Sequence, residues 1–401
     1  MIYLDNASTT PIRTTVLAEM MPYYEELFGN PGSLCELGRQ AKGAVEDARI
    51  KVAEFMGTTP EHIIFTSGGS EGNNLVLRGL APYLREKSKS RVVRSSIEHD
   101  SVRRCLGEMN HREYYVSNYD FSFNWTEMLE NLEREVTPYT GLVTTMYVNN
   151  ETGYRMPVRM INELCRDRGI LFHTDAVQAA GFFPLDAEEM CDFMTISSHK
   201  IHGPKGVGAI YVRDPSMLSP IISGGEDQEF GLRSGTENVA GIVGFGEACR
   251  IAGSNLRRSR DTVEELVKLF LTTLATELHV ESYRPNTAHL MPRDNGTGFA
   301  LNIDDREIDL LCRRILSIQF DGVDAQTLVL MLDSKSVCVS AGSACRSHNS
   351  KPNASLVAMG YSEQEAGSSI RVSFSELNTD DEVVYAAKAI ADCVKALRAN
   401  V

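Results

Sequence analysis

The sequence predicts an α/β protein whose large domain contains a mostly parallel β-sheet covered by helices, followed by a smaller α+β domain. Through the first two thirds of the chain, short β-rich runs alternate with helical patterns, the order that builds a parallel sheet with helices on both faces. Hydrophobic residues make up 42% and charged residues 23% of the sequence, which is an ordinary globular composition. A chain of 401 residues can bury a large core without disulfides or structural metals.

The predicted strands of the large domain are short, and most are followed by a predicted helix or a glycine-rich loop. We expect strands at 63–66, 91–93, 142–148, 170–173, 193–196 and 208–212, and helices at 71–84, 101–109 and 157–168. Ligands of such sheets bind outside the carboxyl ends of the strands. The unusual residues of this sequence follow several of those strand ends, so a site is expected there.

The second domain is predicted to follow a break at 252–261, with a long helix at 257–278 leading into it. Its further elements are expected in the order strand 298–303, helix 306–315, helix 325–332, strand 337–340, strand 369–374 and helix 380–399. The predicted division is a large domain of residues 1–255 and a small C-terminal domain of residues 256–401. The N-terminal segment is a candidate to pack with the small domain.

Charge and hydropathy exclude several classes of protein. The chain has 40 lysines and arginines against 54 aspartates and glutamates, a formal net charge of −14, so bulk attraction to nucleic acid or anionic membrane is not expected. No apolar run reaches the ~18 residues that a spanning helix needs. The start, MIYLDNASTT, lacks the basic and apolar regions of a secretory signal. Neither a nucleic-acid partner nor a membrane partner is therefore expected.

The cysteines indicate free thiols. Nine of them are irregularly spaced, at positions 35, 105, 165, 191, 249, 312, 338, 345 and 393. No C-x-x-C occurs and no Cys/His cluster has zinc spacing, so no metal site is expected. This pattern is typical of a reducing compartment, which predicts a cytoplasmic protein. Most of the nine are expected to be small buried apolar residues.

The first candidate site is the sequence TSGGSE at 66–71, between a predicted strand and a predicted helix. Small residues such as Gly69 let backbone N–H groups approach an oxyanion, and the helix N-terminus favours negative charge. Ser70 could add a hydroxyl donor and cap the helix. The alternative is a simple glycine turn with a serine cap.

Two further candidates follow later strands. In HTDAVQ at 173–178, Asp175 ends an apolar strand, where a carboxylate could bind a heteroaromatic N–H⁺; the alternative is a helix cap. In SSHKIHGPKG at 197–206, Lys200 follows a strand and precedes a Gly/Pro-rich loop. A desolvated lysine near other cations is a usual nucleophilic amine; the alternative is a surface lysine.

The three candidates together fit one ligand. A glycine-rich turn that binds phosphate, a carboxylate that pairs with a ring nitrogen and a lysine that reacts with an aldehyde are the parts of a pyridoxal 5'-phosphate site. The sequence resembles the cysteine desulfurases of the NifS/IscS type, which belong to the class V aminotransferase superfamily and have the pyridoxal-phosphate fold type I. The resemblance runs nearly end to end. Besides the three candidate sites, it includes YLDNA at 3–7, NPGS at 30–33, EH at 98–99, NNETG at 149–153, RSGTEN at 233–238, SAGSAC at 340–345 and RVS at 371–373.

The resemblance implies roles for the residues that would handle the cofactor ring. Lys200 would bond to the cofactor aldehyde and later move the substrate Cα proton. Asp175 would pair with the pyridinium nitrogen, and His99 would stack on the ring and assist proton transfers. Gln178 would contact the phenolic oxygen, with Asn150 near it and the substrate.

The resemblance also implies how the phosphate and the substrate are held. Gly69, Ser70, Ser197 and His199 would hold the phosphate. Thr236 would reach the phosphate of the other subunit, which predicts a homodimer with shared sites. Arg371 would clamp the substrate carboxylate bidentately, a task that lysine performs poorly.

Cys345 is the predicted sulfur carrier, in a stretch of small and polar residues. The resemblance implies that its thiolate attacks the sulfur of L-cysteine, that L-alanine leaves, and that a persulfide remains for a protein acceptor. A thiol of ordinary pKa is only slightly ionised at neutral pH, so some activation is needed. Iron–sulfur assembly, tRNA thiolation and DNA phosphorothioation are the candidate pathways.

Alternative functions use the same scaffold. A selenocysteine lyase could employ the same residues, whereas another class V aminotransferase-like enzyme would not need Cys345. A catalytically silent scaffold of a sulfur-transfer complex would not need to keep the set Lys200, Asp175, His99, Arg371 and Cys345. A yellow protein that releases sulfide and alanine from cysteine would separate the first hypothesis from the last.

The sequence departs from the family pattern in four places. Cys35 replaces the usual histidine, for which we expect a packing role rather than a second sulfur site. Gly69 and Ser70 replace the commoner alanine and threonine, and Ser375 replaces a glycine. The last residues, 395–401, lack a recognisable scaffold-docking tail, which favours specialised sulfur delivery over housekeeping iron–sulfur assembly.

Overall fold

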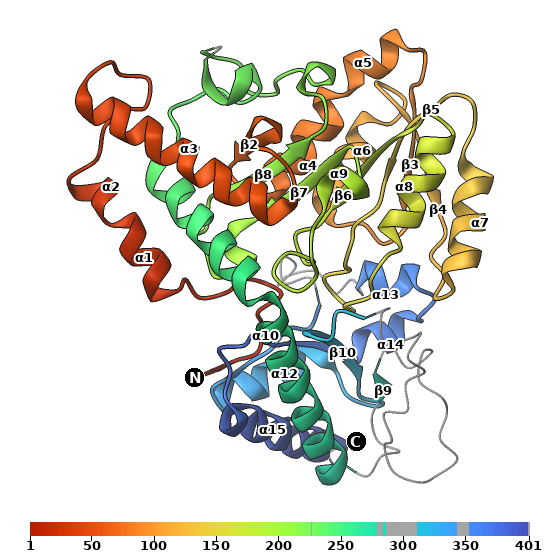
Figure 1. Ribbon diagram of the computed structural model, residues 1–401. Helices are drawn as coiled ribbons and strands as arrows, with labels where there is room; N and C mark the ends of the chain where they lie inside the picture. The colour runs from red at the N-terminus through yellow and green to blue at the C-terminus, as the bar shows by residue number, and fades with distance from the viewer. Residues whose placement is uncertain (226, 279–283, 286–310, 343–352, 400–401) are drawn as a thin grey trace.

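The computed structural model describes residues 1–225, 227–278, 284–285, 311–342 and 353–399. Figure 1 shows a large upper lobe built around one sheet and a smaller lower lobe that contains both chain ends. The predicted fold class is confirmed, because the sheet of the upper lobe is mostly parallel and is flanked by helices. In the described part of the chain, no helix is both long and apolar enough to cross a membrane.

The large sheet has seven strands in the order β2-β8-β7-β6-β5-β3-β4. Strands β4, β3, β5, β6 and β7 run parallel to one another, and β8 is antiparallel to both β7 and β2. Strand β2 therefore points the same way as β7, and the carboxyl ends of six strands share one edge. The bounds are β2 Ile63–Thr66, β3 Arg91–Ser95, β4 Tyr115–Tyr119, β5 Thr140–Thr144, β6 Leu171–Asp175, β7 Phe193–Ser197 and β8 Gly208–Val212.

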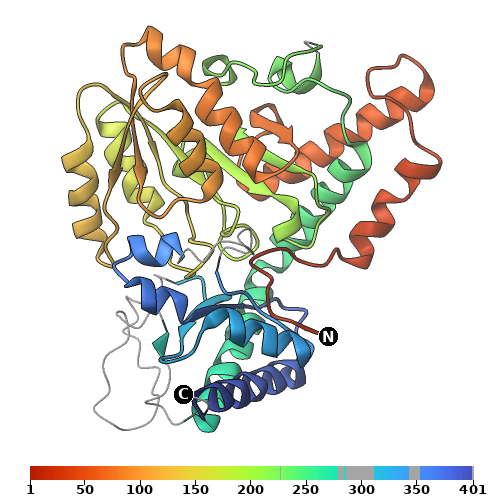
Figure 2. The ribbon, with the colours of Figure 1, turned by 180° about the vertical axis from the view of Figure 1, so that it is seen from behind.

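Neighbouring residues along each strand pack on opposite faces of the sheet. Ile64 belongs to one buried apolar cluster, whereas Ile63 and Phe65 belong to the other, as the two-residue period of a strand requires. Helices α4 (Gly69–Gly79), α5 (Ala81–Glu86) and α6 (Asp100–Met109) cover the first face and are seen in front in Figure 2. The opposite face packs on α3 (Glu36–Met56), α7 (Trp125–Glu135), α8 (Val158–Asp167) and α10 (Val239–Glu277).

Several helices and one strand of this lobe were not predicted from the sequence. They are α1 (Thr14–Met20), α2 (Pro22–Glu25), α3, α7, α9 (Ala187–Met190) and the edge strand β4. Helix α3 packs extensively on α10 and ends at Gly57, whose φ of 68° is the left-handed conformation that favours glycine. The predicted helix at 71–84 is divided into α4 and α5, with Pro82 in the first turn of α5.

Helix α10 overturns the predicted break at 252–261. It runs without interruption from Val239 to Glu277, for 39 residues, and joins the two lobes in Figure 1. Its first half packs on α3 and its second half on the C-terminal helix α15 (Asp380–Ala399). This packing outweighs the weak helix propensity of Gly253 and its polar neighbours. The predicted domain boundary at 255 lies inside this helix, and the division into two domains stays a prediction.

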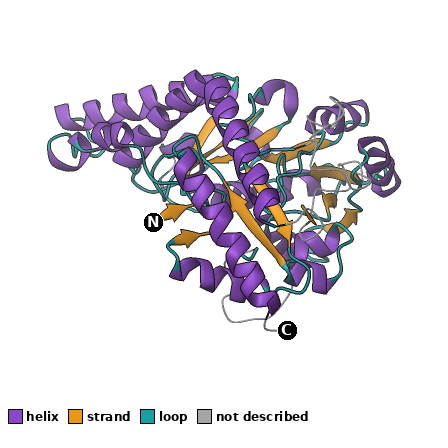
Figure 3. Cartoon of the chain, turned by 90° about the horizontal axis from the view of Figure 1, so that it is seen from below, coloured by secondary structure: helices purple, strands orange, loops and turns teal. Residues whose placement is uncertain are grey.

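The lower lobe contains an antiparallel sheet in the order β12-β10-β9, with bounds Ser369–Ser373, Ile315–Gln319 and Arg284–Pro285. Figure 3 shows helices lying across these strands. The predicted helix at 306–315 is wrong over 311–315, because Ile315 begins a strand that pairs with β12. The predicted strand 298–303 lies outside the described residues. Helices α12 (Ala325–Ser334), α13 (Ala354–Ala358) and α14 (Glu363–Gly367) complete the lobe.

The N-terminal segment joins this lower lobe. Strand β1 (Ile2–Tyr3) pairs in parallel with β11 (Val337–Cys338). The chain then crosses to the large sheet, where Thr10 donates its backbone N–H to the carbonyl oxygen of His199 at 2.9 Å. Residues 5–10 therefore lie between the two lobes, beside the end of β7.

Candidate active site

A cavity of ≈ 410 Å³ opens at the carboxyl edge of the large sheet. Its walls include residues that follow β2, β3, β6 and β7, together with Ser8, Asn353 and Arg371 from outside the sheet. Ten residues predicted for the site line this cavity: Gly69, Ser70, His99, Asn150, Asp175, Gln178, Ser197, His199, Lys200 and Arg371. The structure thus brings together residues separated by about three hundred positions in the chain.

Lys200 lies at the end of a 3-10 turn, Ser198–Lys200, that directly follows β7. Its Nζ donates to the carbonyl oxygens of Ala7 and Ser8 at 2.5 and 2.9 Å. Burial, with smaller contributions from nearby arginines, lowers the pKa of Lys200 to about 8. The alternative of an ordinary surface lysine therefore does not hold, and this amine loses its proton at a lower pH than an ordinary lysine does.

Asp175 ends β6 and is almost fully buried. One carboxylate oxygen accepts from Asn73 Nδ2 at 2.7 Å and the other from the backbone N–H of Val177 at 3.0 Å. The residues after Asp175 form turns rather than a helix, so the alternative of a helix cap is wrong. Its carboxylate, held by two donors, is available to a cationic N–H group in the cavity.

The turn after β2, at residues 66–71, has the features of an anion-binding site and is called the anion cup below. Gly68 has a φ of 146°, which a residue with a side chain rarely adopts, and α4 begins at Gly69. A Cβ on Gly208 would lie 2.8 Å from the Gly68 Cα, so the two glycines let this turn approach β8. Ser70 is exposed and does not cap α4, whose cap residue is Gly68; the predicted capping role of Ser70 is wrong.

Ser197, the last residue of β7, and His199, in the turn that follows, also line the cavity. The Ser197 hydroxyl oxygen is buried, and no hydrogen-bond partner for it occurs among the described residues. An unsatisfied buried donor is costly, and a phosphate oxygen would satisfy it. Burial, with Lys200 and Lys205 next, lowers the pKa of His199 to about 4, so its ring is neutral at pH 7, with Nδ1 3.1 Å from Thr9 Oγ1.

Gln178 and Asn150 both line the cavity. Gln178 Nε2 donates to the carbonyl oxygen of Ala7 at 2.8 Å. Its own backbone oxygen accepts from Arg314 Nη2 at 2.8 Å. Asn150 Nδ2 donates to Glu151 Oε1 at 2.7 Å, which leaves the Asn150 side-chain oxygen as a possible acceptor for a ligand.

Arg371 lies on β12 and is buried between two carboxylates. Nη2 donates to Asp5 Oδ1 at 2.9 Å and to Ser8 Oγ at 2.6 Å, and Nη1 donates to Glu151 Oε1 at 3.2 Å and to the Asn150 carbonyl oxygen at 3.0 Å. Burial opposes the charge of the guanidinium, yet the two acids raise the pKa of Arg371 above its ordinary value. Its buried Nε has no partner in the part of the chain that the structure describes.

His99 is the N-terminal cap of α6. Its Nδ1 accepts the backbone N–H of Ser101 at 3.1 Å and lies 2.8 Å from the Ser101 hydroxyl. The ring is exposed on the cavity wall. A flat ligand in the cavity could therefore cover its face.

Some predicted site residues are not in this cavity. Thr236 is exposed in the loop before α10 and does not line the cavity of its own chain. Cys345 lies outside the described residues. Cys35 is exposed at the cap of α3, so the packing role expected for it is wrong within this chain. Of the other cysteines, Cys338 is partly exposed and the rest are buried as expected.

Some residues of the site were not predicted from the sequence. Glu98 lines the cavity and is fully buried, and burial raises its pKa to about 8. Asn73 and Ser101 also surround the site, and Asn73 touches Asp175. The sequence signals that could have identified these residues are the motifs beside them, EH at 98–99 and the turn at 66–71. The hydroxyl of Ser375 lies 2.9 Å from His202 Nε2, and neither residue lines this cavity.

An acid, an amine of lowered pKa and an anion cup at the carboxyl edge of a mainly parallel sheet define an enzyme of pyridoxal-phosphate fold type I. The class-V aminotransferase family matches residues 2–305 and 301–385. The chain is 37% identical over 399 residues, with 99% of both chains covered, to a protein of Bacillus subtilis (strain 168) named putative cysteine desulfurase IscS 1.

Two solved structures are also similar over most of their length. The structure of a NifS-like protein superposes with a TM-score of 0.85 at 31% identity, covering 98% of this chain and 99% of the other. A second structure, that of SspA in complex with cysteine, has a TM-score of 0.76 at 29% identity, with 94% and 100% covered. The chain therefore belongs to the class-V aminotransferase family, and within it to the cysteine desulfurases of the NifS/IscS type.

Proposed function

We propose that this chain binds pyridoxal 5'-phosphate in the cavity and uses it to transfer sulfur from L-cysteine to the thiol of Cys345. One observation carries the proposal: the Lys200 amine, with its pKa lowered to about 8, shares a cavity with the buried acid Asp175 and the unsatisfied hydroxyl of Ser197. These three groups match the aldehyde, the ring nitrogen and the phosphate of the cofactor.

The remaining predicted residues would hold the cofactor at its edges and faces. Gly69, Ser70 and His199 would join Ser197 around the phosphate, at the N-terminus of α4. Gln178 would contact the ring oxygen, and His99 would cover one ring face. When bound, the cofactor supplies an electron sink for the bonds at the substrate Cα.

The protein's own groups would position L-cysteine and move its protons. Arg371 would bind the substrate carboxylate, and its unsatisfied Nε is a donor not already used by Asp5 or Glu151. The Lys200 amine would take and return the Cα proton, which its lowered pKa favours. Asn150 would contact both the substrate and the cofactor edge. The similar protein SspA forms a complex with cysteine, which supports the choice of substrate.

Cys345 would attack the substrate sulfur and retain it as a persulfide while L-alanine leaves. The described residues on either side of its segment lie beside the cavity. Ser340 and Arg371 exchange backbone hydrogen bonds of 3.0 and 2.6 Å, and Asn353 lines the cavity and donates to Glu151 Oε2 at 3.1 Å. The described residues that flank Cys345 in the sequence are thus bonded to residues of the cavity wall.

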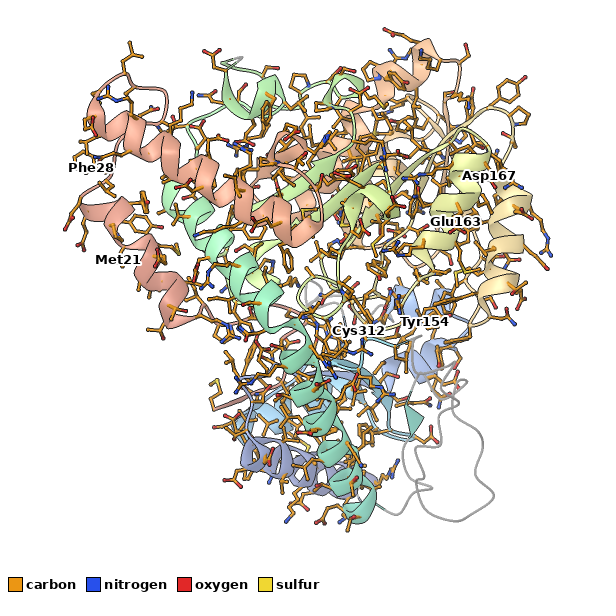
Figure 4. All side chains as sticks on the ribbon, viewed as in Figure 1. Met21, Phe28, Tyr154, Glu163, Asp167 and Cys312 are labelled. Carbon is orange, nitrogen blue, oxygen red and sulfur yellow. The ribbon has the colours of Figure 1, made fainter. Side chains whose placement is uncertain are left out.

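A homodimer would complete the site. Thr236 is exposed, and would reach the phosphate bound in a second copy. Exposed apolar side chains occur along α1, α2 and the loop to α3, and Figure 4 shows Met21 and Phe28 at the outer edge of the large lobe. Several exposed apolar residues on one segment are typical of a protein–protein contact. They are Leu17, Met21, Tyr24, Phe28 and Leu34.

The sulfur acceptor would be a protein, and three pathways stay open: iron–sulfur assembly, tRNA thiolation and DNA phosphorothioation. A net charge of −14 disfavours direct delivery to nucleic acid. The free cysteines fit a reducing compartment such as the cytoplasm.

The proposal is tested with the purified protein and added pyridoxal phosphate. Borohydride reduction followed by peptide mapping should place the cofactor on Lys200, and cysteine with a reductant should yield equal amounts of alanine and sulfide. Lys200→Ala should abolish both results, whereas Lys205→Ala, an exposed lysine of the same loop, should abolish neither. Cofactor found on another lysine, or alanine formed by Lys200→Ala at the wild-type rate, would refute the site.

A further inference from the structure

A chain of hydrogen bonds joins the two residues proposed to contact the cofactor ring from different sides. Asp175 Oδ2 accepts from Asn73 Nδ2 at 2.7 Å. The same nitrogen of Asn73 donates to the Ser101 hydroxyl oxygen at 2.9 Å. The Ser101 hydroxyl lies 2.8 Å from His99 Nδ1. Asp175 and His99 are thereby connected through two residues that have no predicted role.

The donors along this chain have one consistent direction. The Asn73 amide nitrogen has two protons, one for Asp175 and one for Ser101. The Ser101 hydroxyl accepts one of them and is free to donate its own proton to His99 Nδ1. The backbone N–H of Ser101 donates to the same Nδ1. Because Nδ1 receives two donors, the ring proton of neutral His99 belongs on Nε2.

The orientation of Asn73 is fixed by its charged neighbour. Turning the amide over would place its oxygen against the Asp175 carboxylate, where two acceptors would repel each other. In the observed orientation the Asn73 oxygen is buried and has no partner within the described residues. The contact with Asp175 outweighs this unsatisfied atom, as expected for a hydrogen bond to a charged group.

We propose that Asn73 and Ser101 are positioning residues that link the tautomer of His99 to the charge of Asp175. This inference rests on the proposed cofactor site. An ionised Asp175 holds the Asn73 amide, which orients the Ser101 hydroxyl towards Nδ1, so that His99 presents its Nε2–H. Conversely, a proton on His99 Nδ1 would face the N–H of Ser101 and turn its hydroxyl away. The hydrogen bonds from Asp175 to His99 therefore favour an ionised Asp175 and the Nε2–H tautomer of His99. Both states suit a cationic ring nitrogen beside Asp175.

The test measures cofactor affinity and cofactor absorption rather than turnover. Apo-protein is titrated with pyridoxal phosphate, and the dissociation constant and absorption spectrum are recorded. Asn73→Ala should weaken binding about tenfold and Ser101→Ala about threefold, as losses of a charged and a neutral hydrogen bond predict. Both should shift the absorption of the bound cofactor in the same direction, although Ser101 does not touch Asp175. Ser101→Thr, which keeps the hydroxyl, should restore the wild-type spectrum.

Asn162→Ala is the matched control. Like Asn73, Asn162 is a buried helix residue whose side-chain oxygen has no partner among the described residues. Its amide donates one hydrogen bond, to the Glu189 carbonyl oxygen at 2.9 Å, whereas that of Asn73 donates two. It does not line the cavity. Asn162→Ala should therefore lose stability as Asn73→Ala does, while its cofactor spectrum stays unchanged.

The double variant Asn73→Ala/Ser101→Ala decides between a linked chain and two independent contacts. In a linked chain, the double variant should bind the cofactor about tenfold more weakly than wild type, no worse than Asn73→Ala alone. Independent effects would multiply to about thirtyfold. That result, or an unchanged spectrum in Ser101→Ala, would overturn the link while leaving the proposed function intact. If wild-type apo-protein failed to bind pyridoxal phosphate, the proposed function itself would fall. Ser101→Ala, a small change at a partly exposed residue, tests the link even if Asn73→Ala does not fold.

Discussion

Arg233 forms an ion pair with Glu71, with 3.0 Å between Arg233 Nε and Glu71 Oε1. The other oxygen of Glu71 accepts the backbone N–H of Ser67 at 2.8 Å. Glu71 belongs to the anion cup, whereas Arg233 lies in the loop that carries Thr236. The loop proposed to bind the phosphate in a second subunit is thus ion-paired with the anion cup of its own subunit. We therefore expect cofactor binding in one cup to strengthen the dimer, and dimer formation to strengthen cofactor binding.

Arg233→Ala is expected to weaken cofactor binding about threefold to tenfold and to loosen the dimer. Loss of the guanidinium frees Glu71 and leaves a partly buried carboxylate without its ion partner, a change of about 1 kcal/mol. Pyridoxal phosphate titration and analytical ultracentrifugation at several protein concentrations measure the two effects. Arg134→Ala, which removes an exposed helix pair with Glu130, is the control. Equal cofactor affinity in Arg233→Ala and wild type would contradict the coupling.

The attachment of pyridoxal phosphate to Lys200 is expected to accelerate as pH rises. Only the unprotonated amine is a nucleophile, and burial lowers the pKa of Lys200 to about 8, so the rate should rise about tenfold per pH unit below that value and level off above it. Stopped-flow absorption of apo-protein mixed with the cofactor measures the rate. Arg314 is among the cations that lower this pKa, so Arg314→Gln should move the midpoint upward. A pH-independent rate would show that Lys200 is not the attacking amine.

Glu98→Gln is expected to stabilise the apo-protein in mildly alkaline solution. Burial raises the pKa of Glu98 to about 8 in the folded protein, whereas the unfolded chain ionises near the ordinary glutamate pKa. Unfolding therefore releases a proton between these two pH values, and wild-type stability falls as pH rises through that window. Glutamine removes this penalty, so the free energy of unfolding near pH 8 should rise by roughly 4 kcal/mol.

Urea denaturation at several pH values measures the effect of Glu98→Gln. The advantage of the variant should shrink as pH falls towards the ordinary glutamate pKa, because Glu98 then stays protonated in both states. Glu163→Gln changes an unburied glutamate on α8 and should show no such pH dependence. A variant that is less stable than wild type near pH 8 would mean that Glu98 is ionised in the folded protein.

Cys345→Ser is expected to keep the bound cofactor and the spectral response to L-cysteine, because these depend on Lys200, Asp175 and Arg371. Sulfur transfer should collapse, since a hydroxyl is a poor nucleophile and cannot carry the sulfane sulfur. Persulfide labelling with peptide mapping after exposure to cysteine locates the carrier. Cys35→Ser and Cys338→Ser, which change the two thiols not fully buried among the described cysteines, are the controls. Label on either of these and not on Cys345 would overturn the assignment.

The sequence by itself determined where the reactive residues lie relative to the strands. Lys200, Asp175 and the cup at 66–71 each lie at or just after the end of a short apolar strand, and the strand pattern alone puts such residues at one edge of a parallel sheet. The strands β2 and β8 and the helix α15 have the predicted bounds, because their periodic apolar residues agree with the way they are buried. The resemblance to cysteine desulfurases then supplied roles for ten of the residues that line the cavity.

Only the tertiary structure decided which distant groups touch these residues. Lys200 Nζ meets the Ala7 carbonyl oxygen, 193 positions away, and Arg371 meets Asp5, 366 positions away. No local pattern encodes such contacts, since they depend on how the N-terminal segment crosses between the lobes. The burial that shifts the pKa of Lys200 and Glu98 has the same origin. Packing also overrode local signals in α10, where contacts with α3 and α15 keep a glycine-containing segment helical.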